Sequence, residues 1–176
     1  MKFDEVPLPG AYLIELEPMV DERGFFARTW CEEEFRLHGL NASLAQCSVS
    51  FNTRRNTLRG MHYQSEPHAE AKVVRCIAGA IYDVLLDLRP GSPTYLGWYA
   101  AELSAANRRM LYIPEGFAHG FQTLVDHCEV FYQISRPYSP EYARGVRWND
   151  PRFGIEWPDR NPILSPKDSA FADFQS

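Results

Sequence analysis

Short runs in which apolar and polar residues alternate recur along the chain, and Gly, Pro, Asn and Asp separate them. Successive side chains of a strand point to opposite faces, and these runs are rich in β-branched and aromatic residues, so each one predicts a strand. The predicted strands cover residues 11–17, 25–30, 44–51, 57–64, 72–78, 80–88, 97–104, 109–114, 120–125 and 129–135. So many short strands are typical of a β-barrel or of a roll made of two sheets.

Only one early segment has a helical pattern. Residues 31–39, CEEEFRLHG, begin with acidic side chains and end at Gly39. Acidic residues favour the first turn of a helix and glycine favours its end, so a short helix is predicted here. From residue 149 onward the chain carries four prolines, and we expect residues 149–176 to wrap irregularly around the surface as short turns.

The length and composition indicate one globular domain spanning residues 1–176. A chain of this size buries about two-thirds of its unfolded surface. Hydrophobic residues make up 45% and aromatic residues 14%, which favours a packed core over disorder. No repeat or linker is visible. The N-terminal residues lack the apolar core of a signal peptide, and no run approaches the ~20 apolar residues of a membrane helix.

Net charge limits the classes of partner to expect, and cysteine content indicates the redox compartment. The formal net charge of −5 gives no reason to expect nucleic acid or an acidic membrane as a partner. A local cluster of arginines could still bind a small anion. The four cysteines lack the spacing of a metal site, so we expect reduced thiols in a cytoplasmic protein.

Three chemically active side chains fall on apolar faces of predicted strands. By alternation, His62 shares a face with Leu58, Lys72 with Val74, and Tyr132 with Val130 and Ile134. For a lone His or Tyr, packing in the core is the commoner explanation. Lysine is rarely buried without a partner. Three such groups that could converge inside one barrel favour a functional site.

A metal site is the first alternative for this histidine. Metal-binding barrels of the cupin type use a His-x-His pair after a glycine and a further histidine later. Here Gly60, His62 and His119 are present, but Gln64 occupies the second position of the pair. An amide is a poor substitute for imidazole on a transition metal. We expect neither a metal nor a cofactor, and the chain has no phosphate-loop, dinucleotide or nucleophile-elbow motif.

Several stretches, taken together and in order, resemble the dTDP-4-dehydrorhamnose 3,5-epimerase family. They span about residues 8–168 and read DERGFFARTW, TLRGMHYQ, AKVVRCIAGAIYDVLLDLRPGSPTY, LYIPEGFAHGFQTL, EVFY, WNDPRFGIEWP and SPKD. The resemblance implies a cupin-type jelly roll, an all-β fold, without a metal. It also implies a homodimer that exchanges an N-terminal strand. Its substrate would be a nucleotide-linked 4-keto-6-deoxyhexose inverted at C3 and C5.

The resemblance assigns four catalytic roles. A proton on a carbon beside a ketone is removed by a base, and the resulting enolate is stabilised and then reprotonated from the opposite face. His62 would be the base, held by the carboxylate of Asp168. Lys72 would be the cation over the C4 oxygen, and Tyr132 would be the acid across the ring.

The resemblance also implies the residues that bind the substrate. Arg23 and Arg59 match phosphate-binding arginines, whose forked guanidinium suits phosphate oxygens. Strand alternation puts Arg59 on the face opposite His62 unless Gly60 forms a bulge. The remaining matches are Phe26, Arg28, Gln46, Ser48, Gln64, His119, Tyr138 and Lys167. Of these, Tyr138 would close over the substrate. Two interpretations of His119 stay open, a turn-stabilising imidazole and a direct contact with the sugar.

Two positions depart from the family pattern. Ser48 stands where the family often has asparagine, which removes one amide from the pocket region. Arg28 stands where dTDP-specific members often carry a carboxylate, so a charge is reversed at a place that could read the base. The nucleotide is therefore open among dTDP, CDP and GDP, and the alternative is that Arg28 faces solvent.

Competing functions remain at this point. A 3-epimerase acting on one carbon of a deoxysugar or heptose would need the same four catalytic residues. A 3,4-ketoisomerase would be expected to use a different set. A sugar-binding cupin without turnover is disfavoured, because binding alone gives no reason to place Lys72 beside a His–Asp pair.

Overall fold

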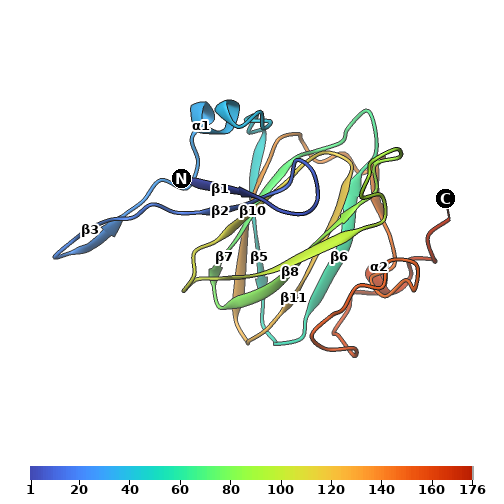
Figure 1. Cartoon of the computed structure of the whole chain (residues 1–176). Coiled ribbons are helices and arrows are strands. Elements are labelled where there is room, and N and C mark those ends of the chain that lie inside the picture. Colours follow the sequence, from blue (N-terminus) through green and yellow to red (C-terminus); the bar gives the residue numbers. More distant parts are fainter. Residues whose placement is uncertain (176) are drawn as a thin grey trace.

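Two antiparallel sheets face each other in the computed structural model, which describes residues 1–175 (Figure 1). The six-stranded sheet has the order β1 (Lys2–Glu5), β2 (Tyr12–Glu15), β10 (Met110–Ile113), β7 (Lys72–Ala78), β12 (Cys128–Ile134) and β5 (Gln46–Asn52). The five-stranded sheet has the order β13 (Ala143–Gly145), β6 (Leu58–Gln64), β11 (Phe117–Thr123), β8 (Ala80–Asp87) and β9 (Trp98–Ser104). The predicted cupin-type jelly roll is confirmed.

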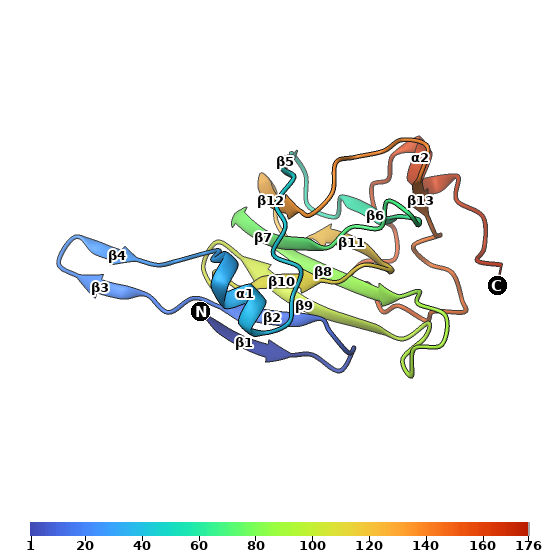
Figure 2. The ribbon, with the colours of Figure 1, turned by 90° about the horizontal axis from the view of Figure 1, so that it is seen from above.

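A separate hairpin, β3 (Met19–Asp21) and β4 (Gly24–Phe26), projects away from the body in both views (Figures 1 and 2). The strand predicted over residues 25–30 is therefore wrong beyond Phe26. Met19 pairs with Phe26, so the next residue would face Pro18, which has no N–H to extend the ladder. Alternation also missed β1, β3 and β13, which are too short to show a period.

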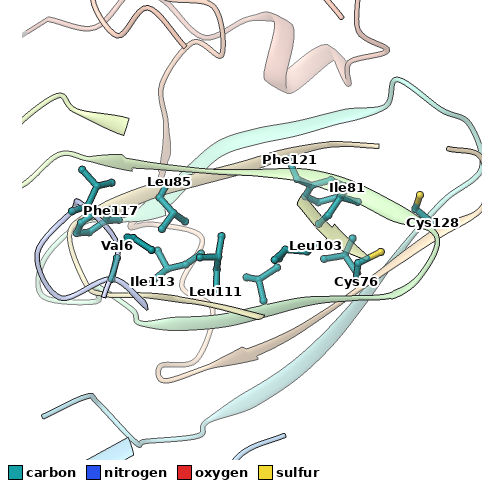
Figure 3. Packing of buried hydrophobic residues seen from close by; sticks show 14 residues of the cluster. Val6, Cys76, Ile81, Leu85, Leu103, Leu111, Ile113, Phe117, Phe121 and Cys128 are labelled. Atoms are coloured by element: carbon teal, nitrogen blue, oxygen red, sulfur yellow. The ribbon is translucent and has the colours of Figure 1, made fainter. Parts of the chain in front are cut away.

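The main core lies between the two sheets (Figure 3). Val74 and Val130 of the six-stranded sheet face Ile81, Leu85 and Phe121 of the other, and all five are nearly inaccessible to solvent. Lys72 and Tyr132 alternate in step with Val74 and Val130, so their strands aim them into the space between the sheets. The predicted faces of these two side chains are confirmed.

Each sheet also has a covered outer face. Helix α1 (Glu32–Leu37) packs Phe35 onto the six-stranded sheet, and its predicted end at Gly39 is confirmed by a φ of +70°. The C-terminal segment covers the five-stranded sheet with Phe153 and Trp157. That segment contains α2 (Pro166–Ser169) where only turns were predicted. Among residues 1–175, neither helix has the length and apolarity needed to cross a membrane.

A bulge between β6 and β11 changes which residues of β6 face inward. His119 pairs with His62 and Phe121 pairs with Arg59, so two residues of β6, Gly60 and Met61, oppose the single residue Gly120 of β11. Gly60 has a φ of +137°, and a Cβ there would lie 2.5 Å from the Cα of Gly120. Only two facing glycines allow this approach.

The bulge overturns the prediction that His62 shares a face with Leu58. Leu58 packs with Met61 in the outer cluster, whereas Arg59 and His62 both face the space between the sheets. Strict alternation fails here because the extra residue shifts the register by one.

The close approach of Gly60 to Gly120 predicts how a substitution at Gly60 changes the stability of the fold. Gly60→Ala should lower the free energy of unfolding by about 3 kcal/mol, because left-handed backbone strain adds to a clash with the backbone of Gly120. Gly154→Ala is the control, since Gly154 also has a positive φ of +61° but open space around it, and it should cost about 1 kcal/mol. Urea unfolding measures both. Equal losses would show that the close approach is not the constraint.

Candidate active site

One cavity of about 380 Å³ opens between the two sheets. The predicted site residues that line it are Gln46, Ser48, Arg59, His62, Gln64, Lys72, His119, Tyr132, Tyr138, Lys167 and Asp168. They come from five strands, the loop after β12 and the C-terminal segment. Residues separated by more than a hundred positions therefore meet at one site.

His62 and Asp168 form a direct pair. His62 Nε2 lies 2.6 Å from Asp168 Oδ1, with the imidazole 39% exposed and the carboxylate 6% exposed. An ionised carboxylate can only accept, so the Nε2–H of His62 donates and Nδ1 keeps the free lone pair. The edge of the His62 ring also packs near Phe171. Asp168 therefore fixes the orientation of the imidazole through Nε2, and Nδ1 stays free of this bond.

The C-terminal segment holds Asp168 in place. Ser165 caps α2 by accepting a hydrogen bond from the Asp168 backbone N–H, and Ile163 bonds to Leu58 at the start of β6. Burial by itself would raise the pKa of Asp168. Hydrogen bonds from His62, Ser165 and the Gly60 backbone outweigh it and hold the pKa below the usual 3.8. The carboxylate is charged at neutral pH.

Lys72 has an acidic partner that the sequence patterns did not reveal. Its Nζ lies 2.9 Å from Glu70 Oε1, and the two side chains are 11% and 8% exposed. Both line the cavity. Glu70 lies in the loop before β7, where strand alternation does not apply, so the sequence pattern carries no signal that identifies it. The cation is held in the cavity by a carboxylate.

Tyr132 enters the cavity from the sheet opposite His62. It belongs to β12 of the six-stranded sheet, whereas His62 belongs to β6 of the other. Burial raises the pKa of the Tyr132 phenol, while a hydrogen bond with Ser50 acts in the other direction. The phenol therefore keeps its proton at neutral pH. An imidazole and a protonated phenol thus lie on opposite walls of the cavity.

His119 lies inside β11, so the interpretation as a turn-stabilising residue is wrong. Its Nε2 lies 2.8 Å from Asp83 Oδ1, and both side chains are buried. Its ring meets Tyr132 edge to face at 6.2 Å. His119 lines the cavity, and its direct contact with a sugar stays a prediction.

Two glutamines of the site hold its rim. Gln64 donates to the His68 carbonyl at 3.0 Å and accepts from the Ser139 N–H at 2.6 Å. Gln46 accepts from the Tyr138 N–H at 2.9 Å. These bonds leave Gln64 poorly placed as a metal ligand. Among residues 1–175, no three His, Cys, Asp or Glu side chains group in a way that could hold a metal ion.

Positive charge lines the cavity beyond Lys72. Arg59 is positioned by a 2.7 Å hydrogen bond from its Nε to Asn52 Oδ1. Lys167 and Arg144 also line the wall, and Arg144 was not predicted. Guanidinium and ammonium groups along one cavity suit an anionic ligand.

Three predicted residues lie outside the cavity of their own chain. Arg23 pairs with Asp21 in the projecting hairpin, and Phe26 is 70% exposed there. Arg28 lies 2.5 Å from Glu34 of α1 and is exposed. Within residues 1–175 of one chain these side chains do not join the site.

Comparison with known proteins identifies close relatives. The family model described as dTDP-4-dehydrorhamnose 3,5-epimerase matches residues 5–176. A protein of that name from Methanothermobacter thermautotrophicus is 46% identical, with 95% of this chain and 91% of the relative covered. The Bacillus anthracis enzyme of that name, solved with TDP and PPi bound, is 41% identical with a TM-score of 0.95, covering 98% of this chain and 99% of that one.

A solved structure named for epimerisation at a single carbon has the same fold. A 3′-monoepimerase from Streptomyces bikiniensis, in complex with dTDP-quinovose, is 32% identical with a TM-score of 0.88. The match covers 96% of this chain and 85% of that chain. Fold similarity alone therefore does not separate inversion at one carbon from inversion at two.

The His62–Asp168 pair predicts a pH dependence of stability. The folded pKa of Asp168 is lowered, so its stabilisation is present above the ordinary 3.8 and lost as pH falls through the folded value. The gap in unfolding free energy between wild type and Asp168→Asn should therefore shrink between about pH 5 and pH 2. Denaturant unfolding across that range measures it.

The control for this experiment is Asp173→Asn. Asp173 is 59% exposed and pairs with Arg147 in the same C-terminal segment, so its contribution should be small at every pH. A constant gap for Asp168→Asn would mean that its hydrogen bonds do not favour the ionised form.

Proposed function

Because this chain belongs to the dTDP-4-dehydrorhamnose 3,5-epimerase family, we propose that it is an isomerase that inverts C3 and C5 of a nucleotide-linked 4-keto-6-deoxyhexose. The conversion is dTDP-4-dehydro-6-deoxy-D-glucose to dTDP-4-dehydro-L-rhamnose. One observation carries the proposal: an Asp168-bound histidine and a protonated tyrosine lie on opposite walls of one cavity that also holds Lys72. Inversion needs a base and an acid on opposite faces of the carbon.

The chemistry follows from the positions of these groups. His62 removes the proton beside the ketone through Nδ1, because Nε2–H is held by Asp168. The resulting enolate carries its charge on the C4 oxygen, where the Lys72 ammonium stabilises it. The Tyr132 phenol then delivers a proton from the other face. C3 and C5 both adjoin C4, so one cation serves both positions.

We also propose that two copies complete the site by exchanging their N-terminal hairpins. The hairpin projects from the body, and Met19, Val20 and Phe26 on it are 63–76% exposed. The edge strand β5 likewise exposes Val49 and Phe51. Docking one arm on its partner would bury these apolar groups and bring Arg23 and Phe26 to the partner's cavity.

The nucleotide and the compartment are part of the proposal. The family name supports dTDP as the nucleotide. The charge reversal at Arg28 is offset in its own chain by Glu34, which supports the same assignment. All four cysteines carry free thiols, which supports a reducing, cytoplasmic compartment. No cofactor or metal enters the mechanism, because proton transfer beside an existing ketone requires neither.

A single-carbon 3-epimerase is the second candidate, because the structurally similar monoepimerase has the same fold. In deuterated water each inverted carbon takes up one deuteron from solvent. Two deuterons per product molecule support the 3,5-epimerase, and one supports the 3-epimerase. A binding protein without turnover would take up none.

The test of the base uses the same exchange assay. His62→Ala should slow deuterium uptake at both carbons by about 10²–10⁴-fold, the usual contribution of a general base. The control is His127→Ala, at an exposed turn, which should leave the rate near wild type. Mass spectrometry of the product reads both variants. Exchange at the wild-type rate in His62→Ala would rule out this base.

Exchange of the β3–β4 hairpin, the arm, predicts how dimers mixed from two inactive variants behave. His62→Ala and Arg23→Ala should each be nearly inactive as pure proteins. If the arm crosses to the partner, random re-assortment restores about a quarter of the wild-type sites, because half of the dimers are mixed and each has one intact site.

The matched control combines His62→Ala with Arg59→Ala, since both residues lie in the body of one chain. Every mixed site then keeps one defect, so no activity should return. The same absence of recovery in the Arg23 mixture would contradict arm exchange.

A further inference from the structure

Glu70 has no role in the mechanism above, although it shares the cavity wall with the catalytic lysine. Its carboxylate is 8% exposed and lies 2.9 Å from Lys72 Nζ. Among residues 1–175, Lys72 is its ion-pair partner, and both side chains line the cavity.

A carboxylate at this position works against the proposed chemistry if it only accompanies Lys72. The cavity is to receive an anionic sugar nucleotide and then an enolate, and a negative group beside the cation weakens the attraction for both. Removing a carboxylate from water is also costly. A hydrogen-bond donor on the bound ligand would offset this desolvation cost.

The substrate of the proposed function contains such a donor next to the ketone. A 4-keto-6-deoxyhexose carries a hydroxyl on C3, so C3 and C4 form an α-hydroxyketone with one donor and one acceptor. The Lys72–Glu70 pair is complementary to it: the ammonium can donate to the ketone, and the carboxylate beside it can accept from the hydroxyl. The spacing within each pair is that of a hydrogen bond.

We propose that Glu70 and Lys72 act as a two-point reader of the α-hydroxyketone, with Lys72 donating to the C4 oxygen and Glu70 accepting from the C3 hydroxyl. This inference rests on the proposed function and adds a specificity-determining residue to it. Deprotonation at C3 places both oxygens in the plane of the new double bond, where they match the two side chains best. The pair therefore selects sugars that keep the 3-hydroxyl.

The experiment compares two substrates, the 4-keto-6-deoxyhexose nucleotide and its 3-deoxy analogue. Both keep the acidic hydrogen on C5, so deuterium uptake at C5, resolved by NMR, can be read for each. In wild type, kcat/KM for this exchange should be on the order of 10–100-fold lower for the 3-deoxy analogue, the cost of leaving a buried charged acceptor unpaired. In Glu70→Ala the two substrates should differ by only a few-fold.

Two further variants separate this role from a structural one. Glu70→Gln keeps an acceptor without the charge, so it should give an intermediate ratio. Glu66→Gln, an exposed carboxylate in the same loop, should keep the wild-type ratio. An equal loss on both substrates in Glu70→Ala would overturn the inference and leave Glu70 as a support for Lys72. If wild type exchanges neither substrate, the proposed function itself fails, and the inference fails with it.

Discussion

The contact between the backbones of β6 and β11 at Gly60 and Gly120 determines which side chains reach the cavity. Without the extra residue in β6, His62 and Arg59 would point to opposite faces of the sheet. The bulge turns both inward, so one strand supplies an imidazole and a guanidinium to the same cavity. The neighbouring strands β8 and β13 pair with β11 and β6 without a register shift, so within the five-stranded sheet the bulge lies beside the cavity.

The rest of the site follows from how two layers meet. The five-stranded sheet brings His62 and His119, and the six-stranded sheet brings Lys72 and Tyr132, so the opposing functional groups are separated by the width of the cavity. The outer layers then complete each wall. The C-terminal segment packs Phe153 and Trp157 on one sheet and thereby carries Asp168 to His62.

The sequence was sufficient for the fold class, most strands, helix α1 and the faces of Lys72 and Tyr132, because alternation and end signals are local. It failed where a residue's partner lies far away in the chain. Alternation could not place Arg59, because the bulge depends on a glycine in another strand. Glu70 was missed because its loop has no period, and its importance is visible only through its contact with Lys72. Arg23 and Phe26 lie outside the cavity of a single chain, and the proposed exchange of hairpins would supply them from a second copy.

The pairing of His62 with Asp168 spans 106 residues, which ties completion of the proposed site to the order in which the protein is made. During synthesis the imidazole is present long before its carboxylate, and domains generally begin to fold from the N-terminal side. A nascent chain could thus form both sheets while its histidine still lacks the group that selects its tautomer. Local detachment of the C-terminal segment in the finished protein would return it to that state without unfolding the sheets. Turnover would therefore report on the docking of this last segment more sensitively than the overall stability of the barrel does.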